Sequence, residues 1–267
     1  MSDFVNTVDS IGDEALTNSI IDRSITEIQD NYVTSIGVYA FQACSALTTA
    51  SFQAATSIGN YAFQACSALT TVDFPAVTSI GDYTFRDCSK LTTVDFPVAT
   101  SIGGAVFQAC SALTTASFQA ATSIGDNAFK GCSALTTADF PAVTNIGVYV
   151  FSNCSALTTV NFPVATSIGS RAFNSCSALT TADFPAVTRI SSNAFQACSK
   201  LTTLILRSGT MATLSNTSAF SDTPIASGTG YIYVPAALVD TYKAATNWTT
   251  YAGQIRAIED YPDICGG

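Results

Sequence analysis

The sequence predicts a repeat solenoid, in which short coils stack and place their strands side by side in a parallel sheet. Three observations lead to this fold class. Phenylalanines from Phe41 to Phe195 recur at every twenty-second position, and cysteines from Cys44 to Cys198 keep the same step. The segment FQACSALTTASFQAATSIG at 41–59 returns unchanged at 107–125. No insertion breaks the period across eight units.

The first element predicted in each coil is a short strand. In LTTVDF (69–74), the apolar Val72 and Phe74 alternate with polar residues, which predicts that both point inward. Thr71 and Asp73 then point outward. Pro75 follows and has no N–H to donate, so it ends the strand ladder. Stacked coils therefore place these strands in one parallel sheet.

The return segment of each coil is predicted to hold short strands, turns or 3-10 segments. In SIGDYTF (79–85), Ile80 and Phe85 form a second inward pair, and Gly81 is expected to turn the chain between them. One coil cannot bury its own apolar face, so neighbouring coils must supply the contacts and both ends need caps.

The ends of the repeat array depart from its pattern. VDSIGDEAL (8–16) is a degraded copy of VTSIGVYAF (33–41), so we assign 1–30 to an N-terminal cap and 31–206 to regular repeats. We expect an irregular last repeat, a final strand at 231–235 and a helical C-terminal cap within 207–258, followed by a loose tail at 259–267. Leu238, Tyr242 and Trp248 are expected to cover the open end of the core.

Composition excludes several classes of function. Hydrophobic residues make up 48% of the 267 residues and charged residues 11%, which is unlike a disordered chain. A net charge of −9 without a basic cluster argues against nucleic acid as a partner. No apolar run reaches the length of about 18 residues that a membrane-spanning helix needs, so we expect no membrane insertion. The chain has no histidine, which removes the commonest general base and metal ligand. We predict no cofactor, no metal and no enzyme.

The unit L-x-x-x-x-F-P-x-x-x-x-I-G-x-x-A-F-x-x-C, as in GNYAFQAC at 59–66, resembles the BspA-type leucine-rich repeat of bacterial cell-surface proteins. The resemblance covers 25–206 strongly and the flanks weakly. It implies a right-handed leucine-rich-repeat solenoid with a concave parallel sheet. It also implies adhesion or protein binding at a bacterial surface, without catalysis.

The N-terminal segment does not decide between several possible locations of the protein. Family members at cell surfaces carry an export signal, whereas residues 1–20 show no basic n-region and no apolar h-region. A cell-surface or extracellular location follows from the resemblance, and a virion or the cytoplasm is the alternative. Relatives without a signal resemble proteins carried by phages and prophages, which makes a virion- or tail-associated role the second hypothesis.

The cysteine column allows three interpretations. Metal sites use C-x₂-C pairs, but each repeat holds one cysteine. Adjacent coils could bring the cysteine Cα atoms within disulfide range, but side chains in register point in parallel, which suits the bond poorly. Cysteine is also a small residue that is often buried. We therefore favour reduced cysteines in the core, with disulfides and metal as the alternatives.

Two surfaces are candidate partner-binding sites. The outward strand column offers carboxylates and an amide for a cation or a basic partner, although such a column also serves as a solvated face. The edge that follows each Ile-Gly pair varies and is rich in Tyr, Asn, Asp, Ser and Arg, as protein-binding surfaces are, although exposed positions also vary freely. The candidate residues are Asp73, Asp95, Asp139, Asn161 and Asp183 on the strands and Tyr39, Tyr61, Tyr83, Tyr149 and Arg171 on the edge.

Two other interpretations rank below binding. A hydrolase could use Asp73 and Asp95, but nothing in the sequence gives each acid its own environment. The threonine column from Thr49 to Thr181 could bind ice on a flat sheet, but strand propensity and hydroxyl ladders explain it better. We therefore predict a non-enzymatic binding protein that engages a protein or glycan on a cell surface.

Overall fold

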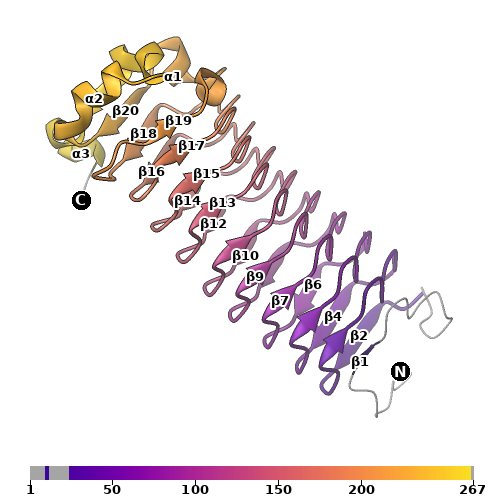
Figure 1. Cartoon of the computed structure of the whole chain (residues 1–267). Coiled ribbons are helices and arrows are strands. Elements are labelled where there is room, and N and C mark those ends of the chain that lie inside the picture. Colours follow the sequence, from indigo (N-terminus) through magenta and orange to yellow (C-terminus); the bar gives the residue numbers. More distant parts are fainter. Residues whose placement is uncertain (1–9, 12–23, 266–267) are drawn as a thin grey trace. The chain divides into compact units, whose positions relative to one another are not determined.

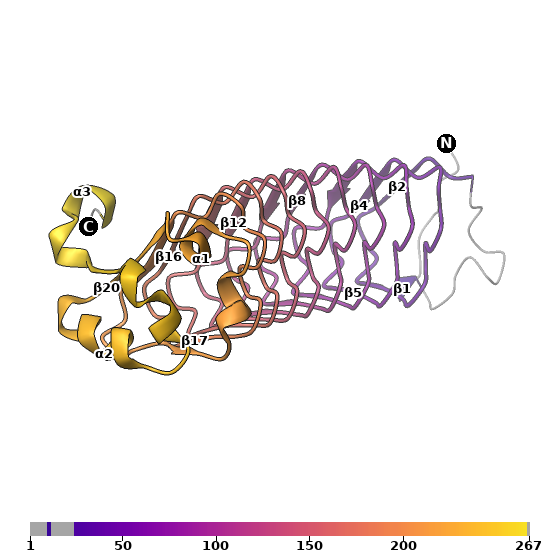
Figure 2. The same ribbon diagram turned by 90° about the horizontal axis from the view of Figure 1, so that it is seen from above.

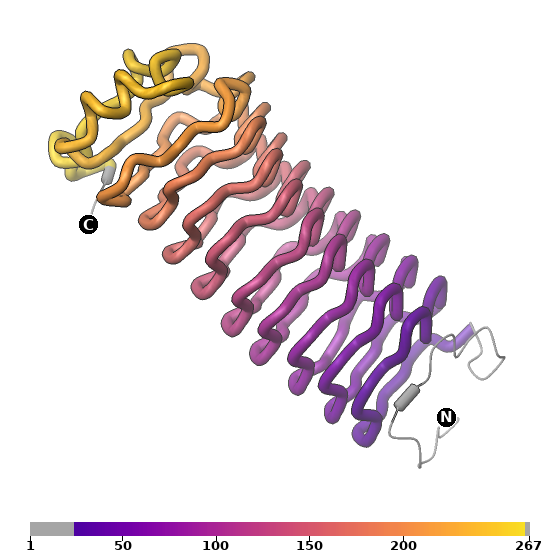
Figure 3. Tube along the Cα trace, in the orientation of Figure 1, coloured from indigo at the N-terminus to yellow at the C-terminus, as the bar shows by residue number. Residues whose placement is uncertain are grey.

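The structure is a computed structural model that describes residues 10–11 and 24–265 (Figure 1). Contacts within the chain group into two compact units, Met1–Leu135 and Thr136–Gly267. The unbroken 22-residue period does not predict this division. Both units are built from stacked coils of the same design, as the repeated path of the trace within each unit shows (Figure 3).

The first unit contains two rows of parallel strands, which lie along opposite sides of the coils (Figure 2). The row of two-residue strands forms one ladder, and the longer strands pair as β2–β4–β6 and as β8–β10. The short strands are β1 (Ser10–Ile11), β3 (Ser35–Ile36), β5 (Ser57–Ile58), β7 (Ser79–Ile80), β9 (Ser101–Ile102) and β11 (Ser123–Ile124). The longer strands are β2 (Glu27–Asp30), β4 (Thr49–Phe52), β6 (Thr71–Asp73), β8 (Thr93–Asp95) and β10 (Thr115–Ser117).

The second unit also contains a row of short strands and a row of longer strands, and it ends in helices. Its short strands form the ladder β13–β15–β17–β19, and its longer strands pair as β12–β14 and as β16–β18–β20–β21. These strands are β12 (Thr137–Asp139), β13 (Asn145–Ile146), β14 (Thr159–Asn161), β15 (Ser167–Ile168), β16 (Thr181–Phe184), β17 (Arg189–Ile190), β18 (Thr203–Leu206), β19 (Thr213–Leu214), β20 (Tyr231–Val234) and β21 (Ile255–Ala257). The helices are η1 (Thr217–Phe220), α1 (Pro224–Ser227), η2 (Ala236–Leu238), α2 (Val239–Ala244), η3 (Trp248–Gln254), η4 (Ile258–Asp260) and α3 (Pro262–Cys265).

Strand register confirms that equivalent residues of successive repeats occupy equivalent places. Ala50 of β4 lies opposite Val72 of β6. Ile28 of β2 lies opposite Ala50, as the sequence predicts. At the N-terminal end, Ile11 pairs with Ile36, so the degraded copy joins the same ladder in spite of its longer spacing.

The core of each coil is built on stacked aromatic rings. In the first unit, Phe63 stacks on Phe85 at 5.3 Å between ring centroids, with the ring planes 9° apart. A second column runs beside it, in which Phe74 and Phe96 stack at 6.1 Å. These side chains are fully buried. Val72 is only half-buried, so the inward residues of a strand are not equally covered.

The glycine after each isoleucine allows coils to approach closely. A Cβ on Gly81 would lie 2.8 Å from the carbonyl carbon of Gly59 in the preceding coil, and one on Gly125 would lie 2.5 Å from that of Gly103. The chain turns directly after Gly81, between Ile80 and Phe85, but the left-handed conformation of this turn lies at Tyr83, whose φ is 59°. Glycine is required here by space.

The C-terminal cap differs from the expectation at its last elements. Tyr231–Val234 forms a strand, but β21 adds to it, so β20 is not the last strand. Tyr242 and Trp248 are fully buried, whereas Leu238 is only partly buried. The segment predicted to be a loose tail contains η4 and α3, and Tyr261 packs edge-on against Tyr233 at 5.3 Å.

In the described part of the chain, the helices are all too short or too polar to cross a lipid bilayer.

Candidate binding surfaces

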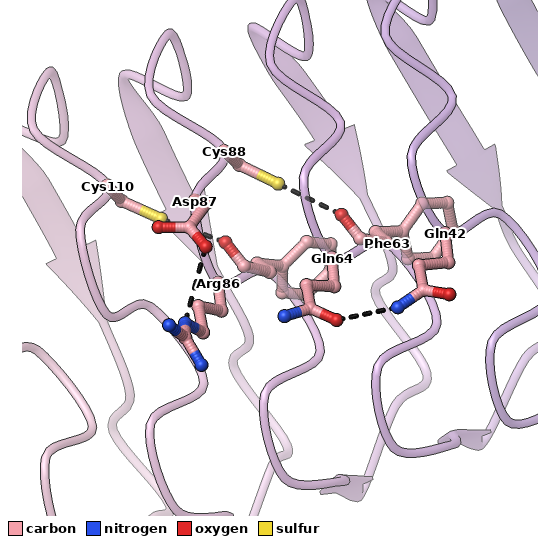
Figure 4. A network of polar contacts seen from close by, with 8 residues as sticks. Gln42, Phe63, Gln64, Arg86, Asp87, Cys88 and Cys110 are labelled. Atoms are coloured by element: carbon pink, nitrogen blue, oxygen red, sulfur yellow. Dashed lines mark hydrogen bonds and ion pairs between the residues drawn. The ribbon is translucent and has the colours of Figure 1, made fainter.

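The cysteine column lies inside the coils and contributes hydrogen bonds. Among the described residues, eight cysteines are free and buried. The thiol of Cys88 donates to the carbonyl oxygen of Phe63 at 3.2 Å, and that of Cys110 donates to Phe85 at 3.1 Å (Figure 4). The prediction of reduced core cysteines is confirmed. The column also joins successive coils, because each of these thiols reaches a carbonyl of the preceding coil.

The environment of the column keeps these thiols protonated. Burial raises the pKa of Cys88, Cys110 and Cys176 well above the ordinary value of a thiol. A hydrogen bond with Cys44, together with burial, raises the pKa of Cys66. Because the thiolate is the reactive form, these cysteines are poor nucleophiles and poor metal ligands.

The outward strand column of the first unit is held by its own hydrogen bonds. Gln53 donates to the Asp73 carboxylate at 2.6 Å, and Ser51 approaches the same oxygen at 3.4 Å. Asp95 is exposed and lies opposite Ser117 in the β8–β10 pair. β6 and β8, which carry Asp73 and Asp95, are in contact, but β6 forms its backbone ladder with β4 and β8 forms its ladder with β10.

The same column in the second unit is also engaged internally. Asn161 donates to the Asp139 carboxylate at 2.8 Å. Arg207 clamps the Asp183 carboxylate through Nε and Nη2 at 2.9 and 2.7 Å. Ile205 is buried against Tyr233, with Ile258 and Tyr261 packed on the pair. Sequence reasoning missed both the arginine clamp and this cover, since neither partner follows the 22-residue step.

The variable edge of the first unit carries a stack of tyrosines. Tyr39 and Tyr61 stack at 4.9 Å, and Tyr61 and Tyr83 stack at 4.8 Å with the ring planes only 4° apart. We call these three residues the tyrosine ladder. The Arg86 guanidinium lies 5.7 Å from the Tyr83 ring centroid and pairs with Asp87 at 3.3 Å. Desolvation raises the pKa of Tyr61, and the negative charges that Tyr39 and Tyr83 would carry if ionised raise it further.

The edge of the second unit joins a tyrosine to an arginine. Arg171 donates to the Tyr149 hydroxyl at 2.5 Å, and its guanidinium carbon lies 5.4 Å from the ring centroid. Tyr149 and Arg171 occupy the same place in consecutive coils, as Tyr61 and Tyr83 do in the first unit. The structure therefore brings these predicted edge residues together.

Backbone conformation marks this edge as a costly place for tyrosine. Tyr39, Tyr61, Tyr83 and Tyr149 all have φ between 57° and 59°, in the left-handed region that side chains other than Gly and Asn disfavour. Asn127 and Asn193 stand at the equivalent place in other coils. These two asparagines, together with Asp87, Gly131 and Asn153 at a second left-handed place four residues further along the coil, are the sequence signal that could have revealed these turns.

The threonine columns serve the backbone. The Thr70 hydroxyl donates to the carbonyl oxygen of Thr48 at 3.0 Å, and the Thr114 hydroxyl donates to that of Thr92 at 3.1 Å. The hydroxyl ladder therefore belongs to the first threonine of each pair, and its predicted place on the second, in the column from Thr49 to Thr181, is wrong. Thr71 and Thr115 are exposed.

In the described part of the chain, side chains of cysteine, aspartate and glutamate do not gather in groups of three that could hold a metal ion.

The chain belongs to the BspA type leucine-rich repeat family. The model of this repeat region, with six copies, matches residues 2–114 and 122–231. A comparison with curated proteins gave no match.

Solved structures share the fold. A leucine-rich repeat protein from Bacteroides ovatus aligns over 87% of this chain with a TM-score of 0.65 at 23% identity, and the chain spans 66% of the length of that protein. A leucine-rich repeat protein from T. pallidum aligns over 58% of this chain and 78% of its own length, with a TM-score of 0.55 at 23% identity. At this level of identity the likeness concerns the fold. It confirms the leucine-rich-repeat solenoid.

Proposed function

We propose that this protein is a non-enzymatic binding protein that engages a protein or glycan on a cell surface through the edge bearing the tyrosine ladder. The observation that carries this proposal is the stacking of three tyrosines from consecutive coils at a half-buried surface. The left-handed backbone at this place recurs in every regular coil, at Ala105 and Arg171 as well as at the tyrosines, so it belongs to the coil design.

The chemistry of the edge supports contact with a partner. Tyrosine and arginine are enriched at protein interfaces, where they bury a large area while keeping a polar group for hydrogen bonding. Stacking holds the three rings in fixed positions, so little side-chain entropy is lost when a partner binds. The strand column is a weaker candidate, because Asp73, Asp139 and Asp183 already accept hydrogen bonds from neighbouring side chains.

The test is a binding screen of the fluorescently labelled full chain on arrays of glycans and extracellular-matrix proteins. For any hit, the triple variant Tyr39→Asn, Tyr61→Asn, Tyr83→Asn should bind at least about tenfold more weakly, the equivalent of about 1.4 kcal/mol. Asparagine stands naturally at this place in two coils, so the fold should persist. Tyr32→Asn is the matched control, since Tyr32 is 68% exposed and lies outside the ladder.

Two outcomes would contradict the proposal in different ways. Silence on both arrays would remove the binding function and leave a scaffold role. Undiminished binding by the triple variant would keep the function and move the site elsewhere. The second hypothesis, a virion- or tail-associated binding protein, uses the same surface, and neighbouring genes for capsid or tail proteins would favour it.

A further inference from the structure

Several arginines lie with the guanidinium group over a tyrosine ring. These arginines differ in their hydrogen bonds and in whether a carboxylate balances their charge. The distances from guanidinium carbon to ring centroid are 5.7 Å for Arg86 and Tyr83, 5.4 Å for Arg171 and Tyr149, and 4.7 Å for Arg256 and Tyr231.

Arg256 is the most firmly oriented of these. Its Nη1 donates to the carbonyl oxygens of Gly253 and Ile255 at 2.8 and 2.9 Å. Its guanidinium carbon lies over the Tyr231 ring. Two acceptors and a ring fix one nitrogen and one face of the group, so its other N–H donors have a set direction. A guanidinium fixed in this way binds a carboxylate with little loss of side-chain freedom.

The charge of Arg256 has no counter-ion within the described part of the chain. Arg86 pairs with Asp87 and Arg207 pairs with Asp183, whereas Arg171, like Arg256, has no described carboxylate within ion-pair distance. No described carboxylate lies within ion-pair distance of Arg256, and the nearby Glu259 accepts a hydrogen bond from the backbone N–H of Ala236 at 2.9 Å. Binding an external carboxylate is more favourable for a half-buried guanidinium group that lacks a counter-ion than for one that already forms an ion pair.

The surroundings of Arg256 resemble the centre of a protein interface. The register places it opposite Tyr233, which is buried under Tyr261, while Tyr231 is 37% exposed. A charged anchor beside aromatic groups that exclude water is typical of interface hot spots. Tyr231 already contacts Arg256 and Tyr233 contacts Tyr261, so sugar stacking would compete with these contacts.

We propose that Arg256 is an anchor for a side-chain carboxylate in an acidic segment of a partner protein. This inference deepens the proposed binding function, on which it rests, and adds a second contact point, in the second unit. It names the chemistry that the contact point recognises: an aspartate or glutamate whose two oxygens meet the free N–H donors of the guanidinium.

The test measures binding of a fluorescein-labelled hexaglutamate peptide to the full chain by anisotropy at low ionic strength, against a hexaglutamine peptide. The wild type should prefer hexaglutamate. Arg256→Gln should weaken its binding at least about tenfold, and Arg256→Lys by less, because lysine keeps the charge without the planar fork. Arg189→Gln, which removes the same charge from an exposed residue of β17 in the same unit, should change affinity less than about twofold.

The binding test requires that the Arg256 variants keep a folded C-terminal cap. Trp248 emission and thermal unfolding report whether Arg256→Gln keeps its cap. If it does not, Arg256→Lys and the shift of the Arg256 Nε–H resonance in the wild type on titration with glutarate carry the test. Equal affinity for both peptides, equal losses in the Arg189 and Arg256 variants, or an unmoved resonance would overturn the proposal.

The occupant and the proposed function can be separated. Tighter binding of polygalacturonate than of hexaglutamate, dependent on Arg256, would overturn the protein assignment in favour of an acidic glycan. If the protein binds nothing on the glycan and matrix arrays, the cell-surface function is contradicted. The peptide measurement would still decide separately whether Arg256 binds a carboxylate.

Discussion

The two compact units are built from one coil design but differ in charge. Residues 1–135 contain twelve acidic and four basic residues, and residues 136–267 contain seven and six. The net charges are therefore −8 and −1, which add to the −9 of the chain. Their cores are alike, since Phe63 and Phe85 stack at 5.3 Å in the first unit and Phe151 and Phe173 at 5.5 Å in the second.

The comparison shows that stacking fixes the interior and leaves the surface to vary. An interior residue faces its own copy in the neighbouring coil, so a change in one coil must suit the next. A surface residue faces solvent, and the same place in the coil can hold Tyr83 in one unit and Arg171 in the other. Only the second unit ends in a described helical cap, which includes Trp248, the single tryptophan of the chain. Its fluorescence therefore reports on that unit.

Alkaline pH should produce the largest difference in stability between the two units. A thiol whose pKa is raised on folding keeps its proton while the unfolded chain loses it, so stability falls as pH rises above about 8.5. Each such thiol lowers the free energy of unfolding by up to about 1.4 kcal/mol for each pH unit. The thiols whose pKa is raised are Cys66, Cys88 and Cys110 in the first unit and Cys176 in the second. Far-UV circular dichroism should therefore change at a lower pH than Trp248 fluorescence.

Coincident pH transitions would contradict this prediction and indicate that the units unfold together. Burial also raises the pKa of Tyr242 and Tyr251 in the second unit, but these groups add to the loss only above about pH 10, where an unfolded tyrosine ionises.

Removing a core ring should cost each unit about the same. Phe85→Ala in the first unit and Phe151→Ala in the second each empty a fully buried place in a stacked column, which costs about 3–5 kcal/mol. Urea unfolding followed by circular dichroism and by Trp248 fluorescence would measure both losses. A difference larger than the spread of that range, about 2 kcal/mol, would show that the shared column does not stabilise the two units equally.

Adding one methyl group between coils should cost less. Gly125→Ala in the first unit and Gly169→Ala in the second each bring a Cβ to 2.5 Å from the backbone of the preceding coil, so the coils must separate, at about 1–3 kcal/mol. Gly209→Ala is the matched control, because its Cβ would have nothing within 4 Å. If all three variants were equally stable, the close approach of coils would not be what requires glycine.

A change in ionic strength should produce the smallest difference in stability between the two units. Raising the ionic strength from low to physiological screens the self-repulsion of the acidic first unit more than that of the nearly neutral second. The gain in the free energy of unfolding should be below about 1 kcal/mol in the first unit, as is usual for exposed charges, and smaller in the second. Urea titrations at two salt concentrations, read by circular dichroism and by Trp248, would detect it, and a larger gain at Trp248 would reverse the comparison.

The sequence by itself determined the coil, because its 22-residue period places Phe, Leu, Ile and Cys at fixed interior positions whatever the surface carries. It also located the tyrosine edge. Only the tertiary structure decided that Arg207 clamps Asp183, that Tyr261 covers Tyr233, and that Arg256 lies on Tyr231. These contacts fall outside the repeat or join residues off its step. Periodicity specifies a place within the coil, whereas the direction of a side chain beyond the last regular coil depends on how the irregular cap folds back onto the sheet.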